Sequence, residues 1–169
     1  MSNARRIKTG YRIALMTWVI CLGIILAAVW LHIVYHPYYV EGPSMLPTFQ
    51  EGDIVSTKEP EKIRTGDVVI LRADEPQRTM IKRIQGIPGD TVVIKNGTLY
   101  RNGEATNVSG IREAGILKQP VTLEDQEYIA IGDNVNNSND SRFYGTVNRD
   151  HIDRLVEKKI LPVKKEETR

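Results

Sequence analysis

Gly66-Asp67-Val68-Val69-Ile70-Leu71 is a turn signal followed at once by an apolar run. Gly and Asp are typical of tight turns, whereas β-branched and aliphatic residues are typical of buried strands. The same order recurs at 52–55 and at 89–94. The sequence therefore predicts a mostly β fold. Further strand patterns and Asn-Gly hairpin turns lie at 80–84, Asn96-Gly97, 98–101, Asn102-Gly103 and 128–131.

Two segments of the C-terminal half are harder to assign. Residues 104–127 show no sustained period, so we expect a peripheral insertion or loop region there. Residues 151–160 carry Ile152, Leu155 and Val156 at helical spacing, which predicts a short helix ended by Pro162.

An apolar segment precedes the β-rich part. Residues 13–34 contain no charged side chain and would form a helix about 33 Å long, enough to span a bilayer. The alternative, a cleaved secretory signal, has an apolar core of about 7 to 15 residues and a small-residue cleavage site, whereas this run continues past Ala27-Ala28. We therefore expect one transmembrane helix.

The charges beside this span predict its orientation. Arg5, Arg6, Lys8 and Arg12 stand in the first 12 residues without an acidic residue, which favours a cytoplasmic segment 1–12. The chain is then expected in the cell membrane as a single-pass protein, with residues 35–169 forming one extracytoplasmic catalytic domain. The molecule has 23 Lys and Arg against 21 Asp and Glu. Without the four N-terminal cations, 19 basic residues remain against 21 acidic ones, so this domain is close to neutral and nucleic-acid binding is not expected.

Cysteine and histidine usage excludes other chemistry. The single cysteine, Cys21, lies inside the apolar span, so the domain is expected to have neither a disulfide nor a catalytic thiol. The three histidines do not cluster, and no Cys or His spacing is typical of a zinc site. We predict no metal and no cofactor.

Ser44 is the first candidate catalytic residue, in the stretch Glu41-Gly42-Pro43-Ser44-Met45-Leu46-Pro47-Thr48 about ten residues beyond the span. Gly42 permits an unusual backbone, and Pro43 and Pro47 stiffen the loop, so the hydroxyl can be presented at low entropic cost. The alternative is an ordinary turn serine that makes only local hydrogen bonds.

Lys82 is the second candidate. In a strand it shares a face with Met80 and Ile84, while Ile81 and Arg83 point the other way. A lysine can accept a proton from a serine only when neutral, so its pKa must fall by about 3 units from 10.4 to work near pH 7. Burial in an apolar wall can supply this shift, whereas Arg83 stays charged. The alternative is a solvated lysine.

Taken in order, these motifs resemble those of bacterial type I signal peptidases, membrane-bound serine proteases that remove signal peptides from exported preproteins. The single anchor and Gly-Pro before the serine are similar to the Gram-positive type. The matching blocks are 42–48, 52–55, 82–90 and 132–145, which include Gly132-Asp133-Asn134 and Ser138-Asn139-Asp140-Ser141-Arg142.

The resemblance implies a role for each matching residue. Ser44 would be the nucleophile and Lys82 the general base of a Ser-Lys dyad. Ser138 would hydrogen-bond and orient the lysine, and Asp140 and Arg142 would form a structural ion pair behind the site. Met45 would contact the pocket next to the scissile bond.

The resemblance also implies a β-rich catalytic domain against the membrane, a substrate bound as an added strand, and an acyl-enzyme without a cofactor. The expected partners are exported preproteins with small side chains at the first and third positions before the cut, the lipid bilayer and the secretion translocon. The sequence does not distinguish general from dedicated substrates.

The chain departs from the family pattern at two positions. Val135 stands where many members have arginine after Gly-Asp-Asn. Gly42 stands where the Gram-negative relatives have a serine whose hydroxyl serves the oxyanion hole. The Ser44 N–H can supply one donor, but the second donor is not identified by the sequence.

Three rival functions stay open at this point. A Ser-His-Asp triad would use His151, although its motif order fits no known layout. A catalytically silent assembly factor or chaperone for exported pilus-type proteins would share the fold but usually lacks the serine or lysine. A self-cleaving repressor would share the chemistry, but the anchor argues against it.

Overall fold

The computed structural model describes residues 3–72 and 79–161 and divides into two compact units at the boundary between His36 and Pro37. The first is the helix α1, Asn3–Tyr35. Its segment Arg12–Leu31 has a mean hydropathy of 2.5, and among the described helices it alone is long and apolar enough to cross a membrane. A signal sequence near an N-terminus passes the same test of length and composition.

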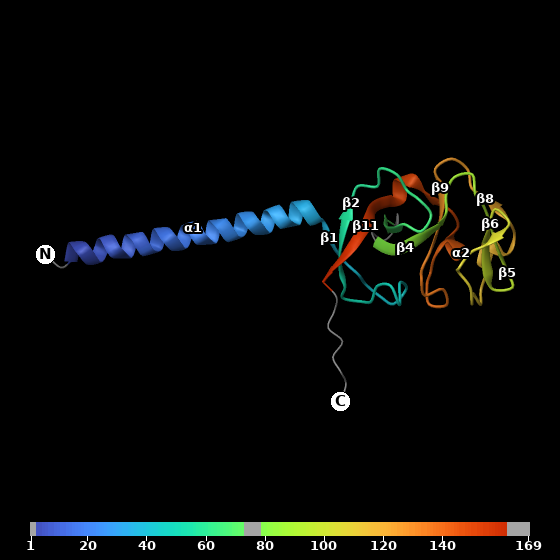
Figure 1. The fold of residues 1–169 in the computed structure, drawn as a ribbon, viewed down its shortest axis with the longest axis horizontal. Helices are drawn as coiled ribbons and strands as arrows, with labels where there is room; N and C mark the ends of the chain where they lie inside the picture. The colour runs from blue at the N-terminus through green and yellow to red at the C-terminus, as the bar shows by residue number, and fades with distance from the viewer. Residues whose placement is uncertain (1–2, 73–78, 162–169) are drawn as a thin grey trace, which may run out of the picture. The chain divides into compact units, whose positions relative to one another are not determined.

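The second unit is mostly β, as predicted, and contains two sheets (Figure 1). The larger is seven-stranded, in the order β1-β2-β11-β3-β4-β9-β10, and the smaller is four-stranded, in the order β7-β6-β5-β8. All the pairings are antiparallel. The strands are β1 Pro37–Tyr39, β2 Ile54–Lys58, β3 Val68–Arg72, β4 Thr79–Gly86, β5 Thr91–Lys95, β6 Thr98–Arg101, β7 Glu104–Ala105, β8 Val121–Thr122, β9 Glu127–Ile131, β10 Val147–Asn148 and β11 Ile152–Leu161.

The predicted turns form as their residues require. Asn96 and Gly97 join β5 to β6 with φ values of 50° and 74°, and Asn102 and Gly103 join β6 to β7 with 53° and 85°. Two successive residues with positive φ are typical of the hairpin turn that matches strand twist. Asn and Gly tolerate this conformation, so these two dipeptides form the turns that let β5, β6 and β7 pair in the smaller sheet.

The helix predicted at 151–160 is wrong. A 3₁₀ turn, η2 (Arg149–His151), leads into the strand β11, which pairs with both β2 and β3 in the larger sheet. Register shifts interrupt the pairing between Ile152 and Arg154 and between Val156 and Lys158. Such bulges break the two-residue alternation of a strand and leave an apolar spacing that imitates a helix. Pro162 lies outside the described residues.

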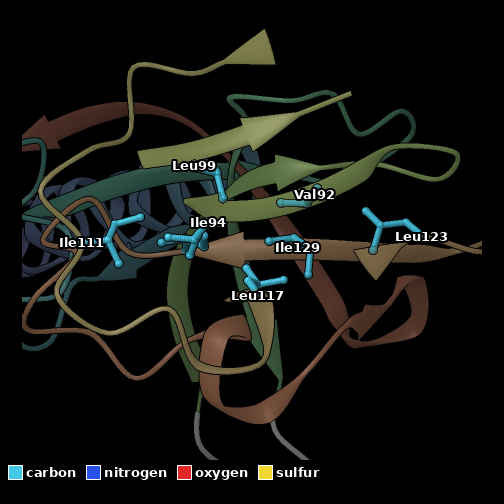
Figure 2. Close-up of a cluster of buried hydrophobic side chains, with 8 residues drawn as sticks. Val92, Ile94, Leu99, Ile111, Leu117, Leu123 and Ile129 are labelled. Atoms are coloured by element: carbon cyan, nitrogen blue, oxygen red, sulfur yellow. The ribbon is translucent and has the colours of Figure 1, made fainter. Parts of the chain in front are cut away.

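The segment 104–127, expected as a peripheral insertion or loop region, contains the short strands β7 and β8 and the 3₁₀ turn η1 (Gly115–Lys118). Its side chains Ile111, Leu117 and Leu123 are buried in a cluster with residues of β5, β6 and β9 (Figure 2). This cluster joins the smaller sheet to the larger one. The segment therefore contributes to the core although little of it is regular.

Two other apolar clusters divide strand β4 by face, as the period of two predicts. Ile81 packs with Val40, Met45 and Phe49 beneath the loop that carries Ser44. Met80 and Ile84 pack with a different cluster that includes Val69 of β3. The loop of the candidate nucleophile is therefore seated directly on the sheet.

Candidate active site

Ser44 and Lys82 meet at hydrogen-bond distance. Lys82 Nζ donates to Ser44 Oγ at 3.0 Å and to the carbonyl oxygen of Ile81 at 3.0 Å. Lys82 is 4% exposed, whereas most lysines keep their side-chain nitrogen in water. Thirty-eight positions separate the two residues in the sequence. The fold thus brings together the two residues that the sequence indicated as a nucleophile and its base.

The surroundings of Lys82 favour its neutral form. Burial lowers the pKa of the Lys82 ammonium below its ordinary value of 10.5, and the negative charge of Asp140 acts in the opposite direction. Desolvation is the larger effect because taking an ammonium out of water is costly without a close counter-ion. A neutral amine within 3.0 Å of a hydroxyl can accept its proton.

The loop of Ser44 is held by the residues that follow β9. The backbone N–H of Asn134 donates to the Ser44 carbonyl oxygen at 2.9 Å, and its side-chain amide donates to the Pro43 carbonyl oxygen at 3.1 Å. A Cβ built at Gly132 would lie 2.6 Å from the Ser44 carbonyl oxygen and would collide with Ser138. Only glycine fits this close approach.

A second connection joins this loop to the strand of Lys82. Arg83 donates two hydrogen bonds to Asp133, of 2.7 Å and 2.6 Å, and a third of 2.7 Å to the Gly66 carbonyl oxygen. Thr48 Oγ1 donates to the same Asp133 carboxylate at 2.6 Å. Hydrogen bonding to Asp133 raises the pKa of Arg83 still further, so the guanidinium stays charged. The carboxylate therefore ties the nucleophile loop to β4.

The sequence did not predict this network. From the sequence alone, Arg83 is only an unsuitable base and Thr48 is only one residue of the motif at 42–48. A signal existed, because Arg83 is adjacent to Lys82 and Asp133 stands in the Gly-Asp-Asn block. Their separation of 50 positions hides the pairing from local pattern analysis.

Asp140 and Arg142 form a buried ion pair. Arg142 donates from Nε and Nη2 to the two carboxylate oxygens at 2.7 Å and 2.9 Å, and both side chains are at most 2% exposed. Asp140 also accepts the Arg142 N–H and thereby caps the one-turn helix α2 (Ser141–Tyr144). Arg142 further donates to the carbonyl oxygens of Glu113 and Ser138. The pair joins three segments behind the dyad.

Ser138 does not make the hydrogen bond to Lys82 that the resemblance implied. Its Oγ is buried and has no hydrogen-bond partner among the residues that the structure describes. It packs instead against Gly132, which also contacts the carbonyl oxygen of Ser44. A buried hydroxyl without a partner is costly, so this atom is a candidate for rearrangement during turnover.

The other predicted site residues differ in accessibility. Gly42 has a φ of +74° and open space where a Cβ would stand, so it leaves room beside Ser44. Met45 is fully buried in the apolar cluster under the loop, and a contact with substrate stays a prediction. Val135 packs against the cluster that joins the two sheets. His151 lies in the turn η2, and its next residue, Ile152, pairs with Leu71 near the end of β3.

The sequence matches known proteins over most of its length. The family described as "Signal peptidase, peptidase S26" matches residues 12–160. A signal peptidase I from Bacillus amyloliquefaciens is 36% identical over 138 residues, covering 73% of this chain and 72% of that protein. A signal peptidase I from Bacillus licheniformis is 32% identical over 153 residues, with 80% and 82% covered.

Further matches carry the same name. Signal peptidase I S of Bacillus subtilis strain 168 is 34% identical over 139 residues, covering 73% of this chain and 74% of that protein. A crystal structure of a signal peptidase I from Enterococcus faecalis V583 covers 60% of this chain and 98% of its own, at 25% identity and a TM-score of 0.44. The sequence matches alone are sufficient: the chain belongs to the signal peptidase family of serine peptidases, peptidase S26.

Proposed function

We propose that this chain is a membrane-anchored signal peptidase I that removes N-terminal signal peptides from exported preproteins through a Ser44-Lys82 dyad. The observation that carries the dyad is the 3.0 Å contact between Lys82 Nζ and Ser44 Oγ, with the lysine buried and its pKa lowered. The relatives named signal peptidase I support the substrate class.

The chemistry proceeds in two stages. Neutral Lys82 accepts the proton of Ser44 Oγ as the oxygen attacks the scissile carbonyl carbon, and the resulting ammonium then protonates the leaving amine. This leaves the signal peptide esterified to Ser44 and releases the mature chain. Neutral Lys82 then takes a proton from water as the water oxygen attacks the ester carbon, and the resulting ammonium returns that proton to Ser44 Oγ as the ester bond breaks. The signal peptide leaves with a free carboxyl group, and Ser44 and neutral Lys82 are regenerated.

The negative oxygen that develops in each stage requires hydrogen-bond donors. The backbone N–H of Ser44 is one donor, while Pro43 has no N–H and Gly42 has no hydroxyl. A backbone group or water completes the oxyanion hole in the open space beside Gly42. Loss of one such donor in related acyl transfer costs about 3 kcal/mol, so the second donor matters for rate.

Strand β4 offers a place for the signal peptide. Strand β3 pairs with Thr79 through Arg83, whereas β9 pairs only with Arg83 through Gly86. Within the described chain, the edge of β4 from Thr79 to Lys82 is therefore unpaired on its β9 side. An extended peptide can add to such an edge through main-chain hydrogen bonds. We place the residues before the cut along this edge, with Met45 and Gly42 nearby.

The anchor and its orientation belong to the same proposal. Helix α1 supplies a span of sufficient length and apolarity, and the cations at its start favour a cytoplasmic N-terminus. The chain should resist alkaline extraction from membranes. Protease added outside the intact membrane should degrade residues after 35 and leave the first 12 protected.

Activity is tested with the full chain in detergent and a preprotein that has a small-x-small cleavage site. The native chain should cut at this site, and Ser44→Ala and Lys82→Ala should be folded and inactive. His151→Ala is the matched control and should retain activity, because the base is Lys82. If Ser44→Ala and Lys82→Ala cut as well as the native chain, the dyad is wrong.

The alternative of a silent assembly factor draws no support from the relatives, which are named as peptidases. It would gain support only if the native chain bound preproteins without cutting them.

A further inference from the structure

A polar cleft of 790 Å³ lies between the nucleophile loop and the smaller sheet. Thr48 borders it on the loop side, Ala105 and Ser109 border it on the side of β7 and the segment that follows, and Arg83 and Gln85 of β4 also line it. This volume is in the range of clefts that bind ligands. Neither Ser44 nor Lys82 lines it, so it is distinct from the dyad.

The cleft begins where the unpaired edge of β4 ends. Along β4 the order is Thr79 to Ile81 at the open edge, then Lys82, then Arg83 and Gln85 in the cleft. Gly132 lines the cleft and also approaches the Ser44 carbonyl oxygen. A substrate whose scissile bond lies at Ser44 therefore has an open strand edge on one side of that bond and this cleft on the other.

The lining suits a polar main chain. Most of the residues around the cleft are polar, and the apolar ones are small, namely Ala105, Val108 and Val135. The Arg83 guanidinium is already bound by Asp133 and Gly66, so it does not make a strong anion site. Arg101 makes only a 3.4 Å hydrogen bond to the Gln85 carbonyl oxygen and a 3.9 Å ion pair with Asp90. It can still donate to a peptide carbonyl or to a polar side chain.

We propose that this cleft binds the substrate segment that follows the scissile bond, which becomes the N-terminus of the released protein. The proposal rests on the proposed peptidase function. From Lys82 to Gln85 the strand advances about 10 Å, and an extended peptide advances about 3.3 Å per residue. The cleft therefore takes about the first three or four residues after the cut, as an extended polar peptide.

Binding outside the reacting bond can accelerate the chemical step when it positions the bond against the nucleophile. The test compares two peptides with the same residues up to the cut. One continues for a single amidated residue, and the other continues for six polar residues. With the full native chain in detergent, kcat/KM for the long peptide should exceed that for the short one by about tenfold.

Blocking the cleft should remove this advantage. Ala105 is exposed on β7, and Ala105→Trp would fill the cleft from the side of the smaller sheet. The ratio of kcat/KM between long and short peptides should fall to near one. Ser109→Trp, farther along the same wall, should have the same effect and guards against a local folding defect in one variant. Circular dichroism and thermal unfolding check both folds.

Thr122→Trp is the matched control, because Thr122 is exposed on β8 at the other edge of the same sheet and does not line the cleft. It should keep the native ratio. If the native chain cuts both peptides equally well, or if both cleft variants keep the ratio, the cleft proposal is wrong while the peptidase function stands. If the native chain cuts neither peptide nor the preprotein, the proposed function is wrong, and the cleft proposal, which depends on it, is wrong as well.

Discussion

Gly132 lies so close to Ser44 that a Cβ on it would stand 2.6 Å from the Ser44 carbonyl oxygen. The next residue but one, Asn134, donates its N–H to that same oxygen at 2.9 Å. The position of the nucleophile therefore depends on the absence of a side chain at 132.

Gly132→Ala should lower kcat by about 100-fold, because the new Cβ collides with the Ser44 carbonyl oxygen and displaces Ser44 relative to Lys82. Gly86→Ala is the matched control: its Cβ meets the side chains of Leu123 and Val92 in the core and not the nucleophile loop. It should lower the melting temperature and keep kcat per folded molecule. Equal effects of the two substitutions on kcat would contradict this role of Gly132.

Lys82→Met should abolish activity and stabilise the fold by about 1 kcal/mol near neutral pH. Burial lowers the folded-state pKa of Lys82, so the unfolded chain binds the proton more tightly. The native chain should therefore gain stability as pH rises from the folded-state pKa towards 10.5, and the difference between the variants should narrow. Urea unfolding at several pH values measures this. A difference in the free energy of unfolding between the native chain and Lys82→Met that does not change with pH would contradict a lowered pKa of Lys82.

Arg142→Gln should lower the free energy of unfolding by about 3 to 5 kcal/mol, because it leaves Asp140 buried without its counter-ion. Arg154→Gln is the comparison. Arg154 pairs with Glu59 at 2.7 Å, but the Glu59 side chain is 73% exposed. Water screens that pair, so its loss should cost at most about 1 kcal/mol. Chemical denaturation compares the two, and similar losses would show that burial does not determine the effect.

Ser138→Ala should leave stability unchanged or raise it by about 1 kcal/mol, because the buried Oγ has no partner to lose. The same change should lower kcat about tenfold if the hydroxyl turns to Lys82 during turnover, as the resemblance implies. Ser138→Cys is slightly larger and is a weaker hydrogen-bond donor, so it should restore little activity. A native kcat in the Ser138→Ala variant would show that the hydroxyl does not orient Lys82 and that Ser138 contributes only to packing.

Local patterns were sufficient for the elements built from short-range turns. The Gly-Asp and Asn-Gly signals fixed β2, β3, β5 and β6 to within a few residues, and the resemblance indicated the contact between Ser44 and Lys82. Strand β11 was missed because its bulges disturb the alternation on which strand prediction depends. Its pairing with two distant strands is a tertiary effect that overrides local spacing.

The part of the site that the sequence did not reveal consists of long-range polar contacts. Arg83 binds Asp133, and Asp133 binds Thr48, across separations of 50 and 85 positions. Nothing in a single sequence distinguishes such pairs from the many other charged and hydroxyl residues. The hydrogen bond between Ser138 and Lys82 is absent from the described structure, although Ser138 matches the family motif. A residue that matches a motif need not make the family's contact in every conformation of the protein.

The unpaired stretch of β4 from Thr79 to Lys82 has a cost for the resting protein. A free strand edge can pair with any extended chain, including a second copy, and so favours aggregation. Here the edge is only a few residues long, which limits the number of main-chain hydrogen bonds that a second copy could form. A partner that pairs only with this edge is therefore held by few hydrogen bonds, which favours release of a cleaved peptide over lasting self-association.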